Sequence, residues 1–326
     1  MIEVEHLTKR YGTHLAVSDL SFQIESGQIY GFLGPNGAGK STTMNIMTGC
    51  LSATEGHVRI GGYDIFEQPE KAKRLIGYLP EQPPLYQNET PLEYLRFVGE
   101  AKGLHGTELT AQIADAVART GIEKVQNRKI AALSKGYKQR VGIAQALLGK
   151  PEIIILDEPT VGLDPFQIIE IRNLVKELGK THTVIFSSHI LSEVQAICDK
   201  ILIISKGRLT ALGTPEELER QLRSAGEIIL TADASAKKVE DILTAVPHIT
   251  EVGSPEPAAD GAVTLRLKTD SDDIHTVSRS IFFAFAGAGT ALLELSVRKA
   301  SLEDVFLELT ESGPAEIFPK EEDEEA

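Results

Sequence analysis

The sequence predicts an α/β protein in which a mainly parallel sheet, flanked by helices, is followed by a smaller α+β domain. One observation is the unbroken apolar run Ile-Ile-Ile-Leu at residues 153–156, which implies a strand covered on both faces. Another is the glycine-rich loop at residues 34–42, which lies between a short β-favouring run and a helical stretch. The third is a change in charge along the chain, which separates the two domains.

Charge is concentrated in the last third of the chain. The 326 residues carry 33 Lys and Arg against 47 Asp and Glu, a formal net charge of −14. Residues 1–220 contain 24 basic and 26 acidic side chains, whereas residues 221–326 contain 9 and 21. We therefore expect a first domain over residues 1–220, an accessory α+β domain over 221–312 and an acidic, disordered tail over 313–326. The acidic balance disfavours nucleic acid or anionic lipid as a partner held by bulk charge.

Neither a membrane span nor a disulfide framework is indicated. The longest apolar run, residues 281–293, contains two glycines and is shorter than the roughly 18–20 residues that cross a bilayer. Residues 1–6 include early acids and lack the apolar core of a signal peptide. Cys50 and Cys198 are far apart in the sequence, so we expect two reduced and largely buried thiols in a cytoplasmic protein.

The first domain alternates between strands and helices, as is typical of an α/β sheet. Residues 28–33 are predicted to form the strand before the glycine-rich loop, and residues 43–49 lie in the helix after it. The stretch 88–150 has few strand-like runs and is predicted to be mostly helical. Further strands are predicted at 153–156, 183–186 and 200–204, with helices around 166–179 and 190–198 between them.

The second domain has the predicted order β-α-β-β-α-β, which is the ferredoxin-like pattern. We expect its first helix to be capped by Ser235, and its second helix to open at Asp272-Asp273 and end at Gly287. Residues 301–304 resemble a capping box that starts another helix. The strands are predicted at 227–231, 248–252, 262–268 and 292–297.

The glycine-rich loop is a candidate phosphate-binding site. It fits the pattern G-x-x-x-x-G-K-[ST], in which glycines let successive N–H groups point at phosphate oxygens in front of a helix N-terminus. Lys40 can reach the β- and γ-phosphates, the Ser41 hydroxyl can ligate Mg²⁺, and Thr42 can add a donor. The candidate nucleotide-binding residues of the loop are Gly34, Asn36, Gly37, Ala38, Gly39, Lys40, Ser41 and Thr42.

Two acids follow the apolar strand at residues 153–156. An isolated Asp-Glu pair is more often a solvated turn, but here a parallel strand precedes the pair and a phosphate-binding loop lies upstream. Asp157 is therefore expected to hold Mg²⁺ through water. Glu158 is expected to polarise the attacking water as a general base.

These residues bring the sequence close to a known family, because residues 1–220 resemble the ATP-binding subunit of an ABC transporter. Five motifs occur in the order of that family. They are 34–42, which resembles its Walker A motif; 133–140, its signature; 153–159, its Walker B motif; 161–165, its D-loop; and 187–189, its switch histidine.

The resemblance implies a P-loop NTPase fold, in which an antiparallel β subdomain and a helical subdomain join the mainly parallel sheet. It also implies that ATP and Mg²⁺ are bound and that further residues join the site. In the family an aromatic at the position of Tyr11 stacks on adenine, and residues at Ser134 and Gly136 contact the γ-phosphate held by the other subunit of a head-to-tail dimer. His189 matches the residue that donates to the γ-phosphate, and Asp164 the one that links the two sites. From the residues alone, Tyr11 could equally be a surface or core tyrosine, Ser134 an ordinary N-cap and His189 a structural histidine.

Three positions depart from the family pattern. The signature has Lys135 in place of glycine and Tyr137 in place of glutamine, whereas its serine and second glycine are present. Glu81 occupies the position of the family's Q-loop glutamine, and Gln82 follows it. A carboxylate at Glu81 can still ligate Mg²⁺ or orient water, so either of these two residues can act there.

The region after residue 220 resembles the tail of ATPase subunits in ABC-2-type exporters of the drug, sodium-export and gliding-motility types. This implies a homodimer or a paralogous ATPase partner, a separate integral membrane permease, no nucleic acid, and a cytoplasmic protein held at the inner face of the cell membrane. A non-transport ABC ATPase acting on ribosomes or nucleic acid is the alternative; a single cassette and the short spacing between Lys40 and Asp157 disfavour it. The accessory domain could be a sensor, or a dimerising or stabilising domain.

Overall fold

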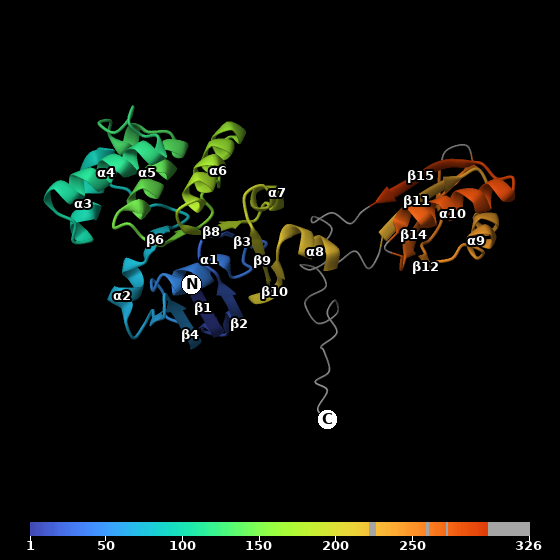
Figure 1. Cartoon of the computed structure of the whole chain (residues 1–326), viewed down its shortest axis with the longest axis horizontal. Coiled ribbons are helices and arrows are strands. Elements are labelled where there is room, and N and C mark those ends of the chain that lie inside the picture. Colours follow the sequence, from blue (N-terminus) through green and yellow to red (C-terminus); the bar gives the residue numbers. More distant parts are fainter. Residues whose placement is uncertain (222–225, 259–260, 272, 299–326) are drawn as a thin grey trace, which may run out of the picture. The chain divides into compact units, whose positions relative to one another are not determined.

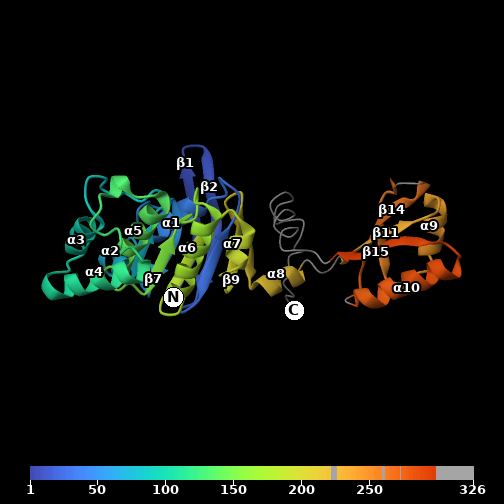
Figure 2. The ribbon, with the colours of Figure 1, turned by 90° about the horizontal axis from the view of Figure 1, so that it is seen from above.

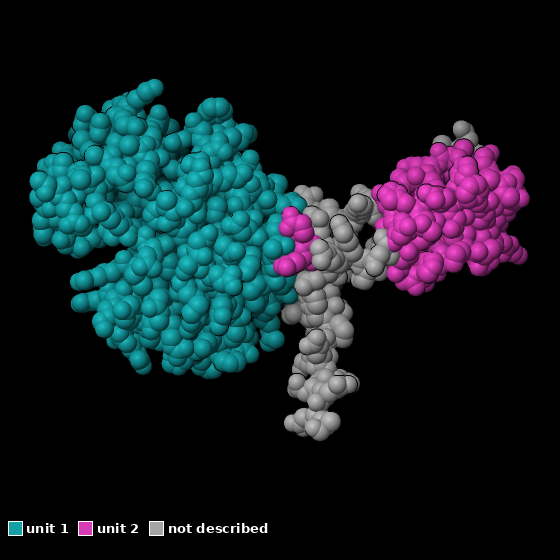
Figure 3. Space-filling model, viewed as in Figure 1, with its two compact units in different colours: residues 1–215, 308–326 teal, residues 216–307 magenta. Residues whose placement is uncertain are grey.

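The computed structural model describes residues 1–326 except 222–225, 259–260, 272 and 299–326 (Figure 1). The described residues form two compact units, Met1–Pro215 and a second that begins at Glu216 (Figure 3). This division falls at the start of α8 (Pro215–Gln221), and the predicted boundary after residue 220 falls near its end. The predicted acidic tail and the capping box at 301–304 lie outside the described residues.

The first unit is built on a six-stranded, mostly parallel sheet. Residues 153–156 are buried throughout, as the unbroken apolar run predicts. Only the pair β9–β10 is antiparallel among the pairings of this sheet. The strand order is β10-β9-β3-β8-β7-β6. The strands are β3 (Ile29–Leu33), β6 (Ile76–Leu79), β7 (Ile153–Leu156), β8 (Thr183–Ser188), β9 (Lys200–Ser205) and β10 (Arg208–Gly213).

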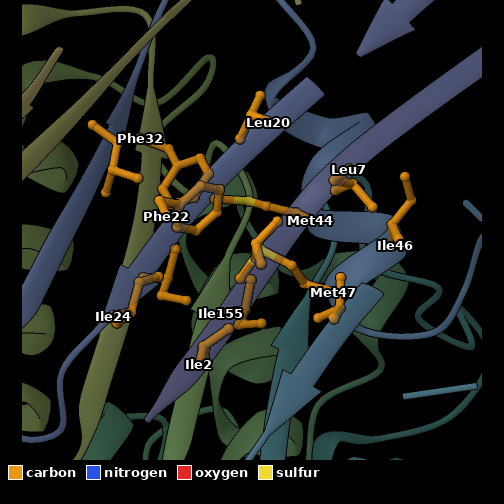
Figure 4. Packing of buried hydrophobic residues seen from close by; sticks show 14 of the residues in the cluster. Ile2, Leu7, Leu20, Phe22, Ile24, Phe32, Met44, Ile46, Met47 and Ile155 are labelled. Carbon is orange, nitrogen blue, oxygen red and sulfur yellow. The ribbon is translucent and has the colours of Figure 1, made fainter. Parts of the chain in front are cut away.

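A second, antiparallel sheet of the first unit packs on the helix that follows the glycine-rich loop, α1 (Lys40–Met47). Met44, Ile46 and Met47 of α1 are fully buried in one cluster with Ile2 and Phe22 of this sheet (Figure 4). The same cluster includes residues of the parallel sheet, so α1 is held between both sheets. The strands are β1 (Ile2–Tyr11), β2 (His14–Ile24), β4 (Glu55–Ile60) and β5 (Tyr63–Asp64), in the order β2-β1-β4-β5.

The stretch predicted to be helical, residues 88–150, contains three α-helices. The first of them starts at a capping box, in which Thr90 Oγ1 accepts from Glu93 N and the Glu93 carboxylate accepts from Thr90 N. The three α-helices are α3 (Pro91–Ala101), α4 (Gly106–Thr120) and α5 (Lys135–Leu147), with the short 3₁₀ helix η1 (Ile130–Ala132) before α5. The helix α2 (Pro69–Arg74) precedes this stretch.

The described part of the first unit also contains the helices α6 (Pro165–Gly179) and α7 (Leu191–Gln195). The prediction of a helix over 190–198 is wrong at its end, because α7 stops at Gln195. The N–H groups of Ile197 and Cys198 both donate to the carbonyl of Val194, which closes the last turn. Asp199 already belongs to the sheet connection, since its carboxylate accepts from the N–H of Ile29.

The two cysteines differ in solvent exposure. Cys198 is buried and packs with Val194 against Gly31, where an added Cβ would lie 2.1 Å from Val194 Cγ1 and 2.9 Å from Cys198 Sγ. Burial raises the pKa of the Cys198 thiol. Cys50 is exposed, so the prediction that both thiols are largely buried is wrong for it. The turn that ends α1, in which Cys50 N donates to Asn45 O, leaves this side chain at the surface.

The second unit has the predicted β-α-β-β-α-β order, with one additional short strand, β13 (Glu256–Pro257). The other elements are β11 (Gly226–Ala232), α9 (Ala236–Leu243), β12 (Ile249–Val252), β14 (Val263–Thr269), α10 (Ile274–Gly287) and β15 (Leu292–Arg298). The strand order is β12-β14-β11-β15, and Figure 2 shows α10 along one face of this sheet. Leu230, Val239, Leu267, Ile281 and Phe285 form its buried core.

Among the described residues, no helix has the length and apolar character needed to cross a membrane.

Candidate active site

The glycine-rich loop lies between β3 and α1, in the strand-loop-helix order that the sequence predicts. Gly37 and Gly39 have positive φ angles of 80° and 105°, which favour glycine. A Cβ on Gly39 would lie 2.7 Å from the carbonyl oxygen of Ala16, and one on Gly34 would lie 2.3 Å from that of Ile204. The loop therefore packs without side chains against its neighbours. It presents the N–H groups of the first turn of α1, which have no intrahelical partner, to the space in front of the helix.

A cavity of about 480 Å³ lies at this helix N-terminus. It brings together residues that are far apart in the sequence and that were predicted separately. Glu81 lines it, whereas its neighbour Gln82 is not among the lining residues. The lining consists of the loop residues Asn36 to Thr42 together with Tyr11, His14, Ala16, Glu81, Glu158, Val161 and His189.

Lys40 joins the loop to Glu158. Its ammonium group, on a side chain 5% exposed, donates to the carbonyl oxygens of Gly34 at 2.7 Å and Pro35 at 3.3 Å. The same Nζ lies 3.2 Å from Glu158 Oε1. Because this ion pair is buried, each partner compensates part of the cost of taking the other out of water.

Asp157 lies behind the loop and is 2% exposed. Its Oδ1 accepts from Ser41 Oγ at 3.1 Å and from Ser187 Oγ at 2.7 Å. Burial raises the pKa of Asp157; the two serine hydrogen bonds oppose this, and the negative charges of Glu158 and Glu81 add to it.

The donors around Asp157 suit a hard dication. The Ser41 hydroxyl and the Asp157 carboxylate are in contact, and Glu81 lines the cavity next to them. Oxygen donors of this kind are those that Mg²⁺ prefers, usually with several waters retained. A bound dication would also offset the burial of Asp157 and its repulsion by the two neighbouring glutamates.

Glu158 is held from several sides. Its φ of 46° lies in the left-handed region, an unusual conformation for a residue with a side chain. Its N–H donates to Ser187 Oγ at 2.7 Å, and its Oε2 lies 2.9 Å from His189 Nδ1. With Lys40 on Oε1 and His189 on Oε2, the carboxylate is fixed at the wall of the cavity.

The predicted signature residues lie elsewhere. Ser134 is the N-cap of α5, and its Oγ accepts from Tyr137 N at 3.4 Å, so the N-cap alternative is confirmed for this serine. With Gly136 and Asp164 it lines a second cavity of about 350 Å³, which shares no lining residue with the first. Asp164 is itself the N-cap of α6, accepting from Gln167 N at 2.9 Å.

Tyr11 ends β1 beside the first cavity and is 48% exposed. Lys9 Nζ lies 5.3 Å from the centroid of its ring, within the range of a cation–π contact. The structure therefore places Tyr11 at the surface rather than in the core. Its ring is accessible for stacking on a planar ligand.

Sequence reasoning missed part of the site. It named Ser187 only as a member of the motif at 187–189, whereas this hydroxyl binds both Asp157 and Glu158. His14 and Ala16 line the cavity and were not predicted, and Val161, which also lines it, was named only as a member of the motif at 161–165. Their positions depend on how the antiparallel sheet and the loop after β7 fold back onto the glycine-rich loop, for which the local sequence carries no signal.

The chain is similar in sequence to known proteins. The family described as "ABC transporter" matches residues 17–161. The linearmycin resistance ATP-binding protein LnrL of Bacillus subtilis is 36% identical over 313 residues, which are 95% of this chain and 98% of LnrL. The bacitracin transport ATP-binding protein BcrA of Bacillus licheniformis is 33% identical, over 96% of this chain and 98% of BcrA.

The solved structures that resemble this chain include proteins of the same family. A structure of the ATP-binding subunit of an ABC transporter superposes with a TM-score of 0.62 at 33% identity, covering 75% of this chain and 99% of that one. A dimeric ATP-binding cassette in a post-hydrolysis state, bound to ADP and Pi, gives 0.60 at 27% identity, covering 66% and 98%. The chain therefore belongs to the family of ABC transporter ATP-binding proteins and is an ATPase.

Proposed function

We propose that this chain is the ATP-hydrolysing subunit of an ABC-2-type exporter and drives a separate integral membrane permease. The observation that carries the proposal is the convergence of the loop, Tyr11, Glu158 and His189 on one cavity. The names of LnrL and BcrA, which refer to linearmycin resistance and bacitracin transport, support an export role. The chain then works in the cytoplasm, at the inner face of the cell membrane, without nucleic acid.

In this site the loop N–H groups and Lys40 bind the phosphates of ATP, and Tyr11 stacks on the adenine. Ser41, Asp157 and Glu81 would hold Mg²⁺, which would neutralise phosphate charge when bound. Glu158 takes a proton from the water that attacks the γ-phosphorus, while the bond from that phosphorus to the ADP oxygen breaks. His189, already within hydrogen-bond distance of Glu158, orients the carboxylate and contacts the γ-phosphate.

A second copy completes the site. Ser134 and Gly136 line a cavity apart from the loop, so in the same chain they contribute nothing to the lining of the ATP cavity. In a head-to-tail homodimer, or with a paralogous ATPase, they meet the γ-phosphate of the partner. Asp164 lines the same second cavity. In the dimer it links the two ATP sites, so that a change at one site alters the other.

The permease binds at an exposed aromatic cluster of α3 and the segment before it. Tyr86 and Phe97 are 50% and 51% exposed, and their ring centroids lie 5.3 Å apart. Tyr94 packs edge-on against Tyr86 at 5.8 Å. Exposed aromatic groups of this kind are typical anchors of protein interfaces.

The aromatic cluster is connected to the ATP site by hydrogen bonds. Tyr94 Oη donates to Gln145 Oε1 at 2.7 Å, and Gln145 Nε2 donates to the carbonyl of Tyr78 at 3.4 Å. Tyr78 Oη in turn donates to Asn45 Oδ1 of α1 at 3.2 Å. These contacts offer a physical route by which permease movement and the phosphate loop influence each other.

The first test is the variant Glu158→Gln. It keeps the shape of the side chain but removes the base, so we expect ATP turnover to fall by ~10²–10⁴-fold while ATP binding persists. Phosphate release and nucleotide affinity measure the two effects. Glu177→Gln, at an exposed glutamate of α6, is the control. Wild-type turnover in Glu158→Gln would contradict the assignment of the base.

The second test concerns the permease. The tagged chain is expected to co-isolate with one membrane protein from detergent-solubilised membranes. Replacing Tyr86 and Phe97 together by Ala should abolish the co-isolation and leave the ATPase activity of the isolated subunit within about twofold, because neither residue lines the ATP cavity. Recovery of the chain only with ribosomes would contradict the export function.

A further inference from the structure

Glu193 of α7 is a buried carboxylate that the mechanism above does not use. It is 3% exposed, and its Oε2 accepts from Thr160 Oγ1 at 2.7 Å and from Ser188 Oγ at 3.0 Å. Both hydroxyl groups belong to buried residues as well. Of the ion pairs formed by the described part of the chain, none includes Glu193. Two hydroxyl donors from two separate segments of the chain therefore stabilise its charge.

One of the two donors, Ser188, is the last residue of β8 and directly precedes the loop that carries His189. Neighbouring residues of a strand face opposite sides of the sheet, so Ser187 and Ser188 point in opposite directions. Ser187 binds Asp157 and the N–H of Glu158, whereas Ser188 donates to Glu193 and accepts from the N–H of Ile190. The backbone that carries His189 is thus fixed on both faces.

The other donor, Thr160, belongs to the loop that follows Glu158 and leads to the second cavity, which Asp164 lines. Thr160 starts its turn, since the carbonyl of Thr160 accepts from Leu163 N at 3.2 Å. Gly162 continues the turn with a φ of 67°, and Asp164 then caps α6. The hydroxyl of Thr160 is therefore the anchor from which this loop reaches Asp164.

We propose that Glu193 is a positioning residue that locks the loop of Asp164 to the loop of His189. One carboxylate oxygen receives both anchors, so a displacement of either loop alone breaks a short, charge-assisted hydrogen bond. The two loops then move together, which ties the residue that faces the partner subunit to the residue beside Glu158. This inference rests on the proposed function, because it concerns the hydrolytic step of that site.

The test compares variants that remove or keep the hydroxyl and the charge. Thr160→Val preserves volume but removes the donor, and Glu193→Gln preserves shape but removes the charge. We expect each to lower kcat about tenfold, because Thr160→Val removes one of the two hydrogen bonds and Glu193→Gln leaves both with a neutral, weaker acceptor; the Kd for ATP should stay within about twofold of wild type. Thr160→Ser, which keeps the hydroxyl, should retain wild-type kcat. Glu177→Gln is the control for loss of an exposed carboxylate.

The outcomes are distinct. A split between kcat and Kd, together with rescue by serine at position 160, supports positioning. An unchanged kcat in Glu193→Gln overturns the proposal, and so does a Thr160→Ser variant as slow as Thr160→Val. A parallel loss of kcat, ATP affinity and thermal stability also overturns it, because it shows a purely structural role. Two other results would contradict the proposed function itself. These are a wild-type chain without ATPase activity and a Glu158→Gln variant with full turnover.

Discussion

In the first unit the side chains of Lys40, Asp157 and Glu158 are all less than one-tenth exposed, whereas the described buried residues of the second unit are apolar apart from Thr269 and Thr290. Burying charge is costly even when it is paired, and an apolar core of the same size folds more stably. The first unit therefore holds groups that are useful for chemistry at a cost in stability. The buried side chains that the structure describes in the second unit include no charged group of this kind.

Breaking the buried ion pair of the first unit should have the largest effect. Lys40→Met removes the phosphate-binding cation and leaves Glu158 without its partner. We expect ATP turnover to fall by ~10²–10³-fold and the free energy of unfolding to fall by ~3–5 kcal/mol. Phosphate release and urea denaturation measure these changes.

The double variant Lys40→Met, Glu158→Gln isolates the pair. Because it removes the unpaired charge together with the cation, it should recover much of the lost stability and none of the activity. If the double variant were as unstable as the single one, the ion pair would not be the source of the loss.

The second unit should respond in stability alone. Phe285 is fully buried in its core, so Phe285→Ala is expected to destabilise this unit by ~3–5 kcal/mol. ATP turnover of the first unit should change by less than about twofold below the unfolding transition. Phe283→Ala is a matched control on the same helix, because Phe283 is 64% exposed and its loss should cost no more than ~0.5 kcal/mol. Equal effects of the two variants would contradict the described core.

The smallest effect is a gain of stability at Asp157. Burial raises the pKa of Asp157 in the folded state, so folding favours the protonated acid. The contribution of this carboxyl group to the free energy of unfolding therefore declines as the pH rises above its pKa in the unfolded chain. Asp157→Asn removes this loss, and its amide oxygen can still accept from Ser41 and Ser187. Without Mg²⁺ we expect a Tm higher than wild type by roughly 2–4 °C at pH 7.5, and no difference at pH 4.

Thermal scans at both pH values, with and without Mg²⁺, measure this effect. The advantage of Asp157→Asn should shrink when Mg²⁺ is added, since only the wild-type carboxylate gains from the cation. An advantage that is the same at pH 4 and pH 7.5 would show that the charge of Asp157 is not its cause.

The sequence predicted the features that are local or periodic. Residues 153–156 predicted a strand buried on both faces, and Gly287 was correctly predicted as the end of the helix α10. The fixed pattern of the phosphate loop placed Lys40 and Ser41 correctly at the start of α1. These patterns depend only on residues that are close in the sequence, so they can be interpreted without knowledge of the tertiary fold.

Other features could not be predicted because they depend on contacts between distant segments. The anchor of Thr160 on Glu193 spans 33 residues, and each residue alone has the sequence context of an ordinary loop or helix. The antiparallel sheet came only from the family resemblance. Its strand β1 carries register shifts and a positive φ at His6, which disturb the alternation that marks a strand. The boundary of the two domains and the roles of the site residues stay predictions.

Gly31 has a consequence for how this ATPase can change over time. Because Val194 and Cys198 occupy the space that a side chain at position 31 would need, α7 rests directly on the backbone of β3. The helix that bears Glu193 and the strand that leads into the phosphate loop therefore share a contact with no room for a larger residue. Substitutions at positions 31, 194 and 198 should be tolerated only in combination, so these three positions are expected to vary together among related sequences.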